Sequence, residues 1–209
     1  MSYQNLIEQL VANKTLKTPR IIEAFKKVDR TNFMLPEYRQ EADIDVPFPI
    51  PAGQTISQPT TVAFMIELLQ PRPNQKILDI GAGSGWTTAI LAEIVGPKGK
   101  VIGAEIIKEV YEFGKNNIEK SGYQNIEYLN IDASGGYEKE APFDRILGSA
   151  SIPQIPEILK RQLKLRGRLV IPVQDSVVLL ERISKNKFKK AVFPFFAFVP
   201  MTGKYGRAN

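Results

Sequence analysis

The stretch Ile77-Leu78-Asp79-Ile80-Gly81-Ala82-Gly83-Ser84-Gly85 decides the fold of this 209-residue chain. Its apolar residues predict a buried strand over residues 76–80, and its glycines predict a tight turn directly after that strand. The apolar pattern beyond the turn predicts a helix over residues 86–95, which Gly96-Pro97 would end. A strand, a glycine-rich turn and a helix in this order indicate a site for a nucleotide-like cofactor.

Strand and helix patterns keep alternating on the C-terminal side of this unit. The alternation predicts an α/β fold: a doubly wound, mostly parallel Rossmann-like sheet with helices on both faces. Consecutive strand patterns near the C-terminus predict an antiparallel edge. The predicted strands after the first are residues 100–104, 126–131, 145–148, 168–173, 177–183 and 191–199, and the predicted helices after the first are residues 107–120 and 153–163.

The N-terminal part of the chain is predicted to be an extension that covers the site. Helical spacing of apolar residues indicates a first helix near residues 6–11, and Thr18-Pro19 indicates the start of a second one. Residues 31–59 are rich in proline and predict a long ordered loop, which leads into a helix that carries Val62 and Leu69. We therefore expect one domain over residues 1–209, with residues 1–58 as its helical and loop extension.

The composition excludes several kinds of chemistry. The sequence contains no cysteine and no histidine, so thiolate nucleophiles, disulfides and a Ser-His-Asp triad are excluded, and a zinc site is improbable. The formal charge is +6, but the densest basic cluster, at residues 185–190, is short and fits a solvated turn and edge strand. No apolar run is long enough for a membrane span or a signal peptide, which predicts a cytoplasmic protein.

The glycine spacing narrows the choice of cofactor. A dinucleotide site needs G-x-G-x-x-G or a final alanine, whereas the third position holds Trp86 or Thr88, depending on the starting glycine. A phosphate-binding P-loop needs a lysine after its last glycine, and here Trp86 follows Gly85. The remaining pattern, G-x-G-x-G with Asp79 two residues earlier, suits S-adenosylmethionine, and we expect the amides near Gly81 and Gly83 to face its amino-acid end.

Acidic residues follow successive predicted strands. Ligands of such sheets bind outside the carboxyl ends of the strands, where Asp79, Glu105 and Asp132 would meet. Glu105 is placed to accept both hydroxyls of a ribose, and Asp132 to accept from the adenine amino group. Taken singly, each acid fits a helix N-cap or a surface charge equally well. Trp86 is predicted to be a core or wall residue.

The loop P-A-G-Q-T-I-S-Q-P (residues 51–59) and the glycine turn together resemble the protein-L-isoaspartate (D-aspartate) O-methyltransferases. Three segments carry the resemblance: D-V-P-F-P-I-P-A-G-Q-T-I-S-Q-P (residues 45–59), I-L-D-I-G-A-G-S-G-W (residues 77–86) and R-L-V-I-P-V (residues 168–173). F-V-P-M-T-G (residues 198–203) is similar to the C-terminal segment of that family. The chain departs from the family at Trp86, where tyrosine is usual, at Ala133, where glycine is common, and in the polar segment 148–153.

The resemblance implies methyl transfer from S-adenosylmethionine to the α-carboxylate of L-isoaspartyl residues in damaged proteins or peptides, which then re-form aspartate through a succinimide. It implies Ser57 as the active-site residue, with Thr202 also near the substrate. The residues implied to bind the cofactor are Thr55, Ile56, Ser57, Gln58, Asp79, Gly81, Gly83, Glu105, Asp132 and Ala133. Ser57 also fits a helix N-cap ahead of Pro59.

The residues agree with this chemistry, because a carboxylate is already ionised at neutral pH and needs no general base. Two alternatives stay open: a nucleic-acid methyltransferase that uses the basic surface, and a non-catalytic module that binds the cofactor. The first lacks an N-P-P-[YF]-type motif and the cysteine of the C5 route. We therefore expect a monomer that binds isoaspartyl polypeptides, with no nucleic-acid or membrane partner and no metal.

Overall fold

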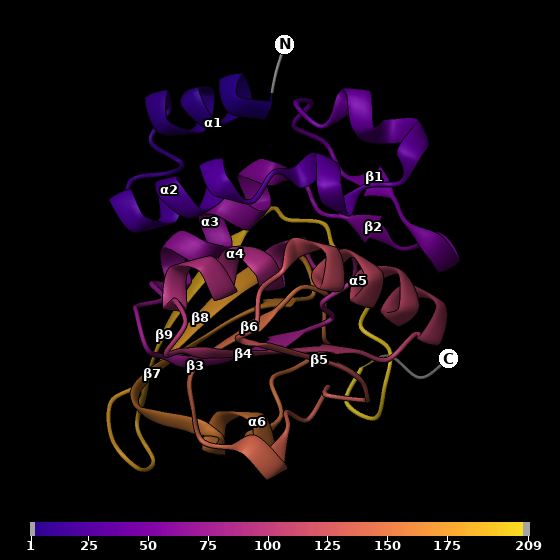
Figure 1. Ribbon diagram of the computed structural model, residues 1–209. Coiled ribbons are helices and arrows are strands. Elements are labelled where there is room, and N and C mark those ends of the chain that lie inside the picture. Colours follow the sequence, from indigo (N-terminus) through magenta and orange to yellow (C-terminus); the bar gives the residue numbers. More distant parts are fainter. Residues whose placement is uncertain (1–2, 207–209) are drawn as a thin grey trace.

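The computed structural model describes residues 3–206, which build a seven-stranded sheet of order β5-β4-β3-β6-β7-β8-β9 (Figure 1). Its first five strands in this order run parallel, whereas β8 pairs antiparallel with both of its neighbours, β7 and β9. The predicted doubly wound sheet with an antiparallel C-terminal edge is thereby confirmed. The strands span Lys76–Ile80 (β3), Lys100–Glu105 (β4), Ile126–Asn130 (β5), Phe143–Gly148 (β6), Leu163–Val173 (β7), Ser176–Arg182 (β8) and Phe188–Pro194 (β9).

Helices cover both faces of the sheet, but unequally (Figure 1). Side chains alternate along β3, so Ile77 packs with Met65 and Leu91 on one face, and Leu78 packs with Leu159 on the other. The first face carries α3, α4 and α5, while the second is covered by α6 and irregular segments. The helices span Tyr3–Ala12 (α1), Pro19–Lys27 (α2), Pro59–Leu69 (α3), Trp86–Val95 (α4), Lys108–Ser121 (α5) and Glu157–Arg161 (α6).

The connections beside β3 set the position of the ligand edge. The chain leaves β3 toward β4 and β5 on one side and later returns to β6 on the other side of β3. The strand order therefore reverses at β3, and this is the place where open α/β sheets bind ligands.

Three predicted elements were wrong in extent. The strand expected over residues 168–173 is β7, which begins five residues earlier, at Leu163. The helix expected over residues 153–163 is only α6, because prolines precede it and Leu163 already belongs to β7. The strand expected over residues 191–199 is β9, which ends at Pro194 because Phe195 adopts a left-handed backbone (φ 70°). Phe195 is 95% exposed, so it is not a core residue of a strand. The apolar residues around it therefore predicted a strand longer than the observed one.

The N-terminal segment packs on helix α4 rather than directly on the sheet. Phe25 of α2 meets the ring of Trp86 edge-on, at 5.8 Å between centroids, and both side chains are buried. The long loop is ordered, as expected. It contains the 3-10 turns Arg30–Phe33, Pro36–Glu41 and Pro51–Gly53 and a small hairpin of Phe48–Pro49 (β1) and Thr55–Ile56 (β2).

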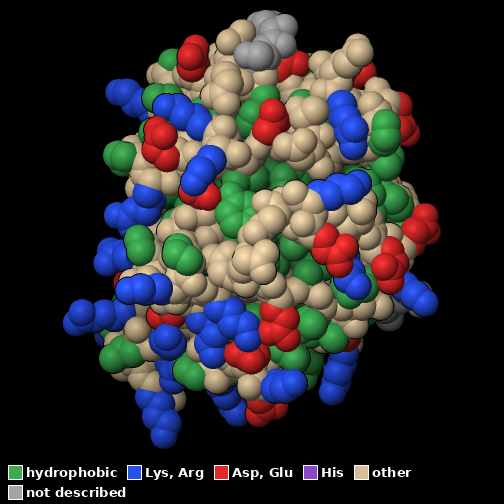
Figure 2. Space-filling view, viewed as in Figure 1, with side chains coloured by type: hydrophobic (Ala, Val, Ile, Leu, Met, Phe, Trp, Pro, Cys, Tyr) green, Lys and Arg blue, Asp and Glu red, His purple; other side chains and the backbone are tan. Residues whose placement is uncertain are grey.

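The basic cluster at residues 185–190 lies on a solvated turn and an edge strand, as predicted. Lys185 and Lys187 belong to the turn between β8 and β9, Lys189 and Lys190 belong to edge strand β9, and all four are exposed. Figure 2 shows Lys and Arg side chains projecting from the lower part of the molecule in this view. Among residues 3–206, no helix is long and apolar enough to cross a membrane.

Candidate active site

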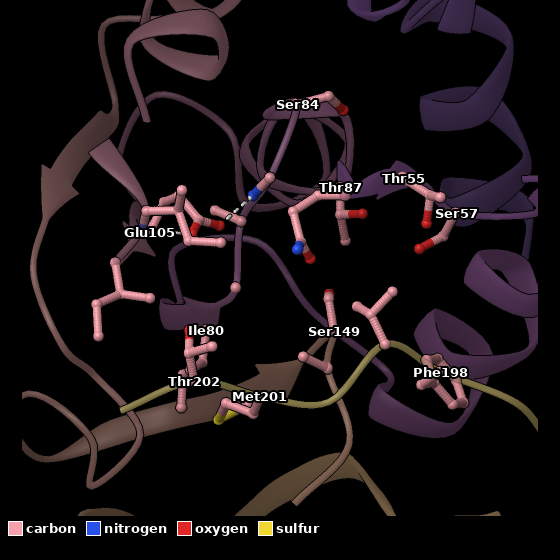
Figure 3. A pocket seen from close by; sticks show the side chains of 18 of the residues that line it. Thr55, Ser57, Ile80, Ser84, Thr87, Glu105, Ser149, Phe198, Met201 and Thr202 are labelled. Atoms are coloured by element: carbon pink, nitrogen blue, oxygen red, sulfur yellow. Dashed lines mark hydrogen bonds between the residues drawn. The ribbon is translucent and has the colours of Figure 1, made fainter. Parts of the chain in front are cut away.

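A cavity of about 430 Å³ lies beyond the carboxyl ends of β3, β4 and β5 (Figure 3). This is the edge that the strand order selects. Its wall combines parts of the chain that are far apart in the sequence. They are residues 54–58, 80–84, 104–107, 131–134, 149–150 and 197–202, with single contributions from Pro47, Ile50, Thr61, Trp86 and Thr87.

The glycine turn forms the floor of the cavity with a left-handed backbone at Gly81 (φ 74°), Gly83 (φ 57°) and Gly85 (φ 84°). Three of the amides that were expected to face the amino-acid end of the cofactor are hydrogen-bonded within the protein. The N–H groups of Gly81 and Ala82 donate to the Ala104 carbonyl at 2.9 and 3.1 Å, and that of Gly83 donates to Glu105. The turn folds back onto β4, so within the described chain the free polar group of Gly81 is its carbonyl oxygen.

Asp79 lies behind this floor and is fully buried. Its Oδ2 accepts a hydrogen bond from the Thr88 hydroxyl at 2.7 Å, whereas Oδ1 has no partner among the described residues. Burial raises the pKa of Asp79 to about 7, against the opposing effect of the Thr88 hydrogen bond. Asp79 does not line the cavity, so any influence on a ligand acts through the glycine turn.

Glu105 lines the cavity from the end of β4 and is only 6% exposed. Its Oε2 accepts from the Gly83 amide at 3.1 Å, and its Oε1 accepts from the Ile107 amide at 3.0 Å. A carboxylate has about four acceptor positions, so each oxygen keeps one for a ligand. Burial raises the pKa of Glu105, although the backbone hydrogen bonds oppose that rise.

Asp132 sits at the exposed rim and ties two segments together. Its Oδ1 accepts from the Ser134 amide at 2.9 Å, and its Oδ2 accepts from the Lys204 amide at 2.8 Å. Partial burial acts to raise the pKa of Asp132, but these hydrogen bonds outweigh it and lower the pKa. The neighbouring Ala133 is buried and lines the cavity. Asp132 therefore anchors the C-terminal segment as well as facing the cavity.

The loop with Thr55, Ile56, Ser57 and Gln58 forms the opposite wall. Gln58 is engaged on both ends: its amide donates to Asp45, and its oxygen accepts from Thr61. Ser57 does not take the alternative role of a helix N-cap. Asp45 does so instead, accepting from the Thr60 amide at 2.8 Å at the start of α3. The Ser57 hydroxyl has no hydrogen bond to any described residue, so it is free for a ligand.

The close-up view separates the two ends of the cavity. Figure 3 shows Ser57 and Thr55 on one side, facing Ser149 and Phe198, and Glu105 with Thr202 on the other side. A smaller adjoining pocket has Ser57, Ser149 and Phe198 in its wall but not Thr202. Thr202, which the resemblance placed near the substrate, thus lies at the Glu105 end.

Two residues behind the loop were missed by sequence reasoning. Arg30 is fully buried and donates to the carbonyl of Ser57, and Asp45 caps α3 from a distant part of the chain. Neither carries a local signal, because Arg30 bonds to backbone carbonyls and Asp45 caps a helix that begins many residues later. Trp86, predicted as a core or wall residue, is 1% exposed and donates from its indole to the Val28 carbonyl.

Comparison with known proteins decides the family. The family model described as protein-L-isoaspartate(D-aspartate) O-methyltransferase matches residues 1–206. The chain belongs to this methyltransferase family. Among its relatives, a protein-L-isoaspartate O-methyltransferase from Methanopyrus kandleri is 42% identical over 97% of this chain and 92% of the relative. A second, protein-L-isoaspartate O-methyltransferase 2 from Archaeoglobus fulgidus, is 45% identical over 90% of this chain and 87% of the relative.

Solved structures of isoaspartate methyltransferases share the fold. A putative protein-L-isoaspartate O-methyltransferase from Plasmodium falciparum, in complex with S-adenosyl-L-homocysteine, aligns with a TM-score of 0.84 and 24% identity. The alignment covers 95% of this chain and 97% of that structure. Another protein-L-isoaspartate O-methyltransferase aligns with a TM-score of 0.87 and 23% identity, over 98% of this chain and 67% of that structure. At these identities the likeness supports the fold.

Proposed function

We propose that this protein transfers a methyl group from S-adenosylmethionine to the α-carboxylate of L-isoaspartyl residues in damaged proteins or peptides. The observation that carries the proposal is the free Ser57 hydroxyl, which shares one cavity with the glycine turn and the Glu105 carboxylate. Membership of the isoaspartate methyltransferase family supports the same reaction.

The residues of the cavity fit the cofactor. Gly81 and Gly83 line the cavity without a side chain, and a Cβ at either position would take up space there, at 3.7 to 3.9 Å from its neighbours. The free Gly81 carbonyl suits an ammonium, and the remaining acceptor positions of Glu105 suit ribose hydroxyls. We assign Asp132, Ala133 and Thr202 to the same end of the cavity. Asp79 would act through the turn, since its charge lies behind the floor.

When bound, S-adenosylmethionine supplies a methyl group on a positively charged sulfur. The protein's work is then to hold the substrate carboxylate in line with that methyl, because the carboxylate is already ionised. Ser57 would donate its hydroxyl proton as a hydrogen bond to one carboxylate oxygen, leaving the other free to attack. Alignment of this kind can lower a barrier by about 7–11 kcal/mol. No proton leaves the substrate, which fits a sequence without histidine or cysteine.

The hydrophobic packing supports treating residues 1–58 as an extension of a single domain. Residues of α1 and α2 share one buried cluster with Trp86 and Ile90 of α4, and residues 54–58 reach the cavity. The sequence-based expectations of a monomer in the cytoplasm, without nucleic-acid or membrane partners, stay predictions.

The test is a methylation assay with labelled S-adenosylmethionine and two peptides that differ only in one isoaspartyl or aspartyl residue. We expect a base-labile methyl ester on the isoaspartyl peptide and background label on its partner. Absence of that ester, with S-adenosylmethionine still bound, would indicate a binding module. Label on RNA or DNA instead would indicate a nucleic-acid methyltransferase.

A further inference from the structure

Arg30 carries a buried charge that the proposed chemistry does not use. Its side chain is 0% exposed, and no carboxylate among residues 3–206 forms an ion pair with it. Burial lowers the pKa of Arg30 to about 10, so the guanidinium stays charged at neutral pH. Its Nε has no hydrogen-bond partner in the described chain. A charge held this way is costly, and apolar side chains of similar volume often serve stability as well or better.

All of its hydrogen bonds go to one segment of the chain. Nη1 donates to the carbonyl of Ile44 at 3.1 Å, and Nη2 donates to the carbonyls of Val46 at 2.7 Å and Ser57 at 3.1 Å. Ile44 and Val46 precede the β1–β2 hairpin, and Ser57 follows it. The guanidinium thus ties together both ends of the hairpin that forms a wall of the cavity.

Aromatic rings fix the guanidinium itself. Its carbon lies 5.4 Å from the ring centroid of Phe48 in β1 and 5.5 Å from that of Trp86 in α4. Phe48 belongs to the hairpin and Trp86 follows the glycine turn, so Arg30 connects the loop to the floor of the cavity. The planar guanidinium of arginine can donate to several acceptors while it stacks on aromatic rings, and the ammonium of lysine cannot reproduce this arrangement.

We propose that Arg30 is a positioning residue for methyl transfer: by holding the Ser57 carbonyl it orients the Ser57 hydroxyl toward the substrate carboxylate. This inference rests on the proposed function. The peptide carbonyl of Ser57 points to Arg30, while its side chain points into the cavity (Figure 3). Loss of the anchor would let the hydroxyl shift, and a misplacement of about 1 Å can reduce the rate about 100-fold.

The variants Arg30→Met and Arg30→Lys test this inference, with Tyr3→Phe as a matched control. Tyr3 lies in the same cluster, with its ring 6.5 Å from that of Trp86, and its hydroxyl has no hydrogen-bond partner among residues 3–206. For both Arg30 variants we expect kcat/KM for the isoaspartyl peptide to fall about 10- to 100-fold, and no further than in Ser57→Ala. We expect S-adenosylmethionine affinity within about threefold of wild type, since the floor is unchanged, and Tyr3→Phe should behave as wild type. Arg30→Lys keeps the charge and guards against a failure of Arg30→Met to fold.

A double-mutant cycle separates positioning from general damage. If Arg30 acts through Ser57, then Arg30→Lys combined with Ser57→Ala should be about as active as Ser57→Ala alone. Losses that multiply in the double variant, or Arg30 variants with wild-type kcat/KM, would overturn the inference. Wild-type protein that fails to methylate the isoaspartyl peptide would instead refute the proposed function, so the two failures are distinguishable.

Discussion

Replacing Asp79 with asparagine should remove a pH-dependent loss of stability. The pKa of this carboxyl group is raised from 3.8 to about 7, chiefly by burial. One pKa unit corresponds to about 1.36 kcal/mol. The rise therefore lowers the free energy of unfolding by about 4 kcal/mol at any pH above both pKa values. The size fits a fully buried side chain with one oxygen hydrogen-bonded and the other without a partner among the residues that the structure describes.

The sign follows from proton binding. Between about pH 4 and pH 7 the folded protein keeps the Asp79 proton and the unfolded chain has lost it, so folded stability falls as pH rises. Below pH 4 both states hold the proton, and above pH 7 neither does, so the contribution is flat outside that window. The asparagine of Asp79→Asn does not ionise, so the stability of this variant lacks the fall with pH that Asp79 causes.

Urea unfolding from pH 4.5 to pH 8 measures the effect as the difference between wild type and Asp79→Asn. Since about 2.5 pH units of the window lie above pH 4.5, we expect this difference to shift by about 3 kcal/mol in favour of the variant as pH rises. Asp175→Asn is a matched control, because Asp175 is exposed on the turn between β7 and β8. Parallel stability curves for wild type and Asp79→Asn would refute the reasoning, as would a measured Asp79 pKa below 5.

Three further predictions concern the site and its floor. Ser57→Ala removes one hydrogen bond to a charged group, so methyl transfer should fall about 10- to 100-fold in the peptide assay while calorimetry shows little change in S-adenosylmethionine affinity. Equal loss of both would mean that Ser57 is structural. Glu105→Gln should weaken cofactor binding about 10- to 100-fold by calorimetry, because the ribose hydroxyls lose a charged acceptor; unchanged affinity contradicts that assignment. Gly85→Ala should destabilise by about 2–5 kcal/mol, combining left-handed strain with a Cβ only 2.9 Å from Ile118. Gly122 has a similar φ of 76°, but a Cβ added there would have no described atom within 4 Å. Gly122→Ala should therefore lower the free energy of unfolding by only about 1–2 kcal/mol, and an equal loss in both variants would show that the Ile118 contact costs nothing.

The parallel part of the fold was readable because its signals are local. The apolar run of β3, the glycines after it and the Gly96-Pro97 stop marked the bounds of β3 and α4 as the structure has them. The C-terminal strands were harder, because the apolar run around Phe195 continues beyond the point where the backbone turns away. Apolar composition alone does not reveal a single left-handed residue.

The candidate site was predictable where topology fixes position. Glu105 ends β4 and Asp132 follows β5, so the sheet alone brings them to one edge. The roles of the Gly81 and Gly83 amides were not predictable, because their partners, Ala104 and Glu105, lie on the next strand. The role of Arg30 was not predictable for a similar reason. Its hydrogen-bond partners are backbone carbonyls, which every residue carries, so no sequence pattern indicates them.

The sequence of edge strand β9 affects how this protein can associate with other polypeptides. An edge strand offers unpaired backbone groups to any extended chain, and damaged, partly unfolded polypeptides are rich in such chains. Lys189 and Lys190 are adjacent and exposed, so they point to opposite faces of the strand, and Pro194 ends it. Burying this edge in a foreign sheet would strip water from ammonium groups on both faces. A repair enzyme built this way can handle aggregation-prone molecules without being drawn into their aggregates.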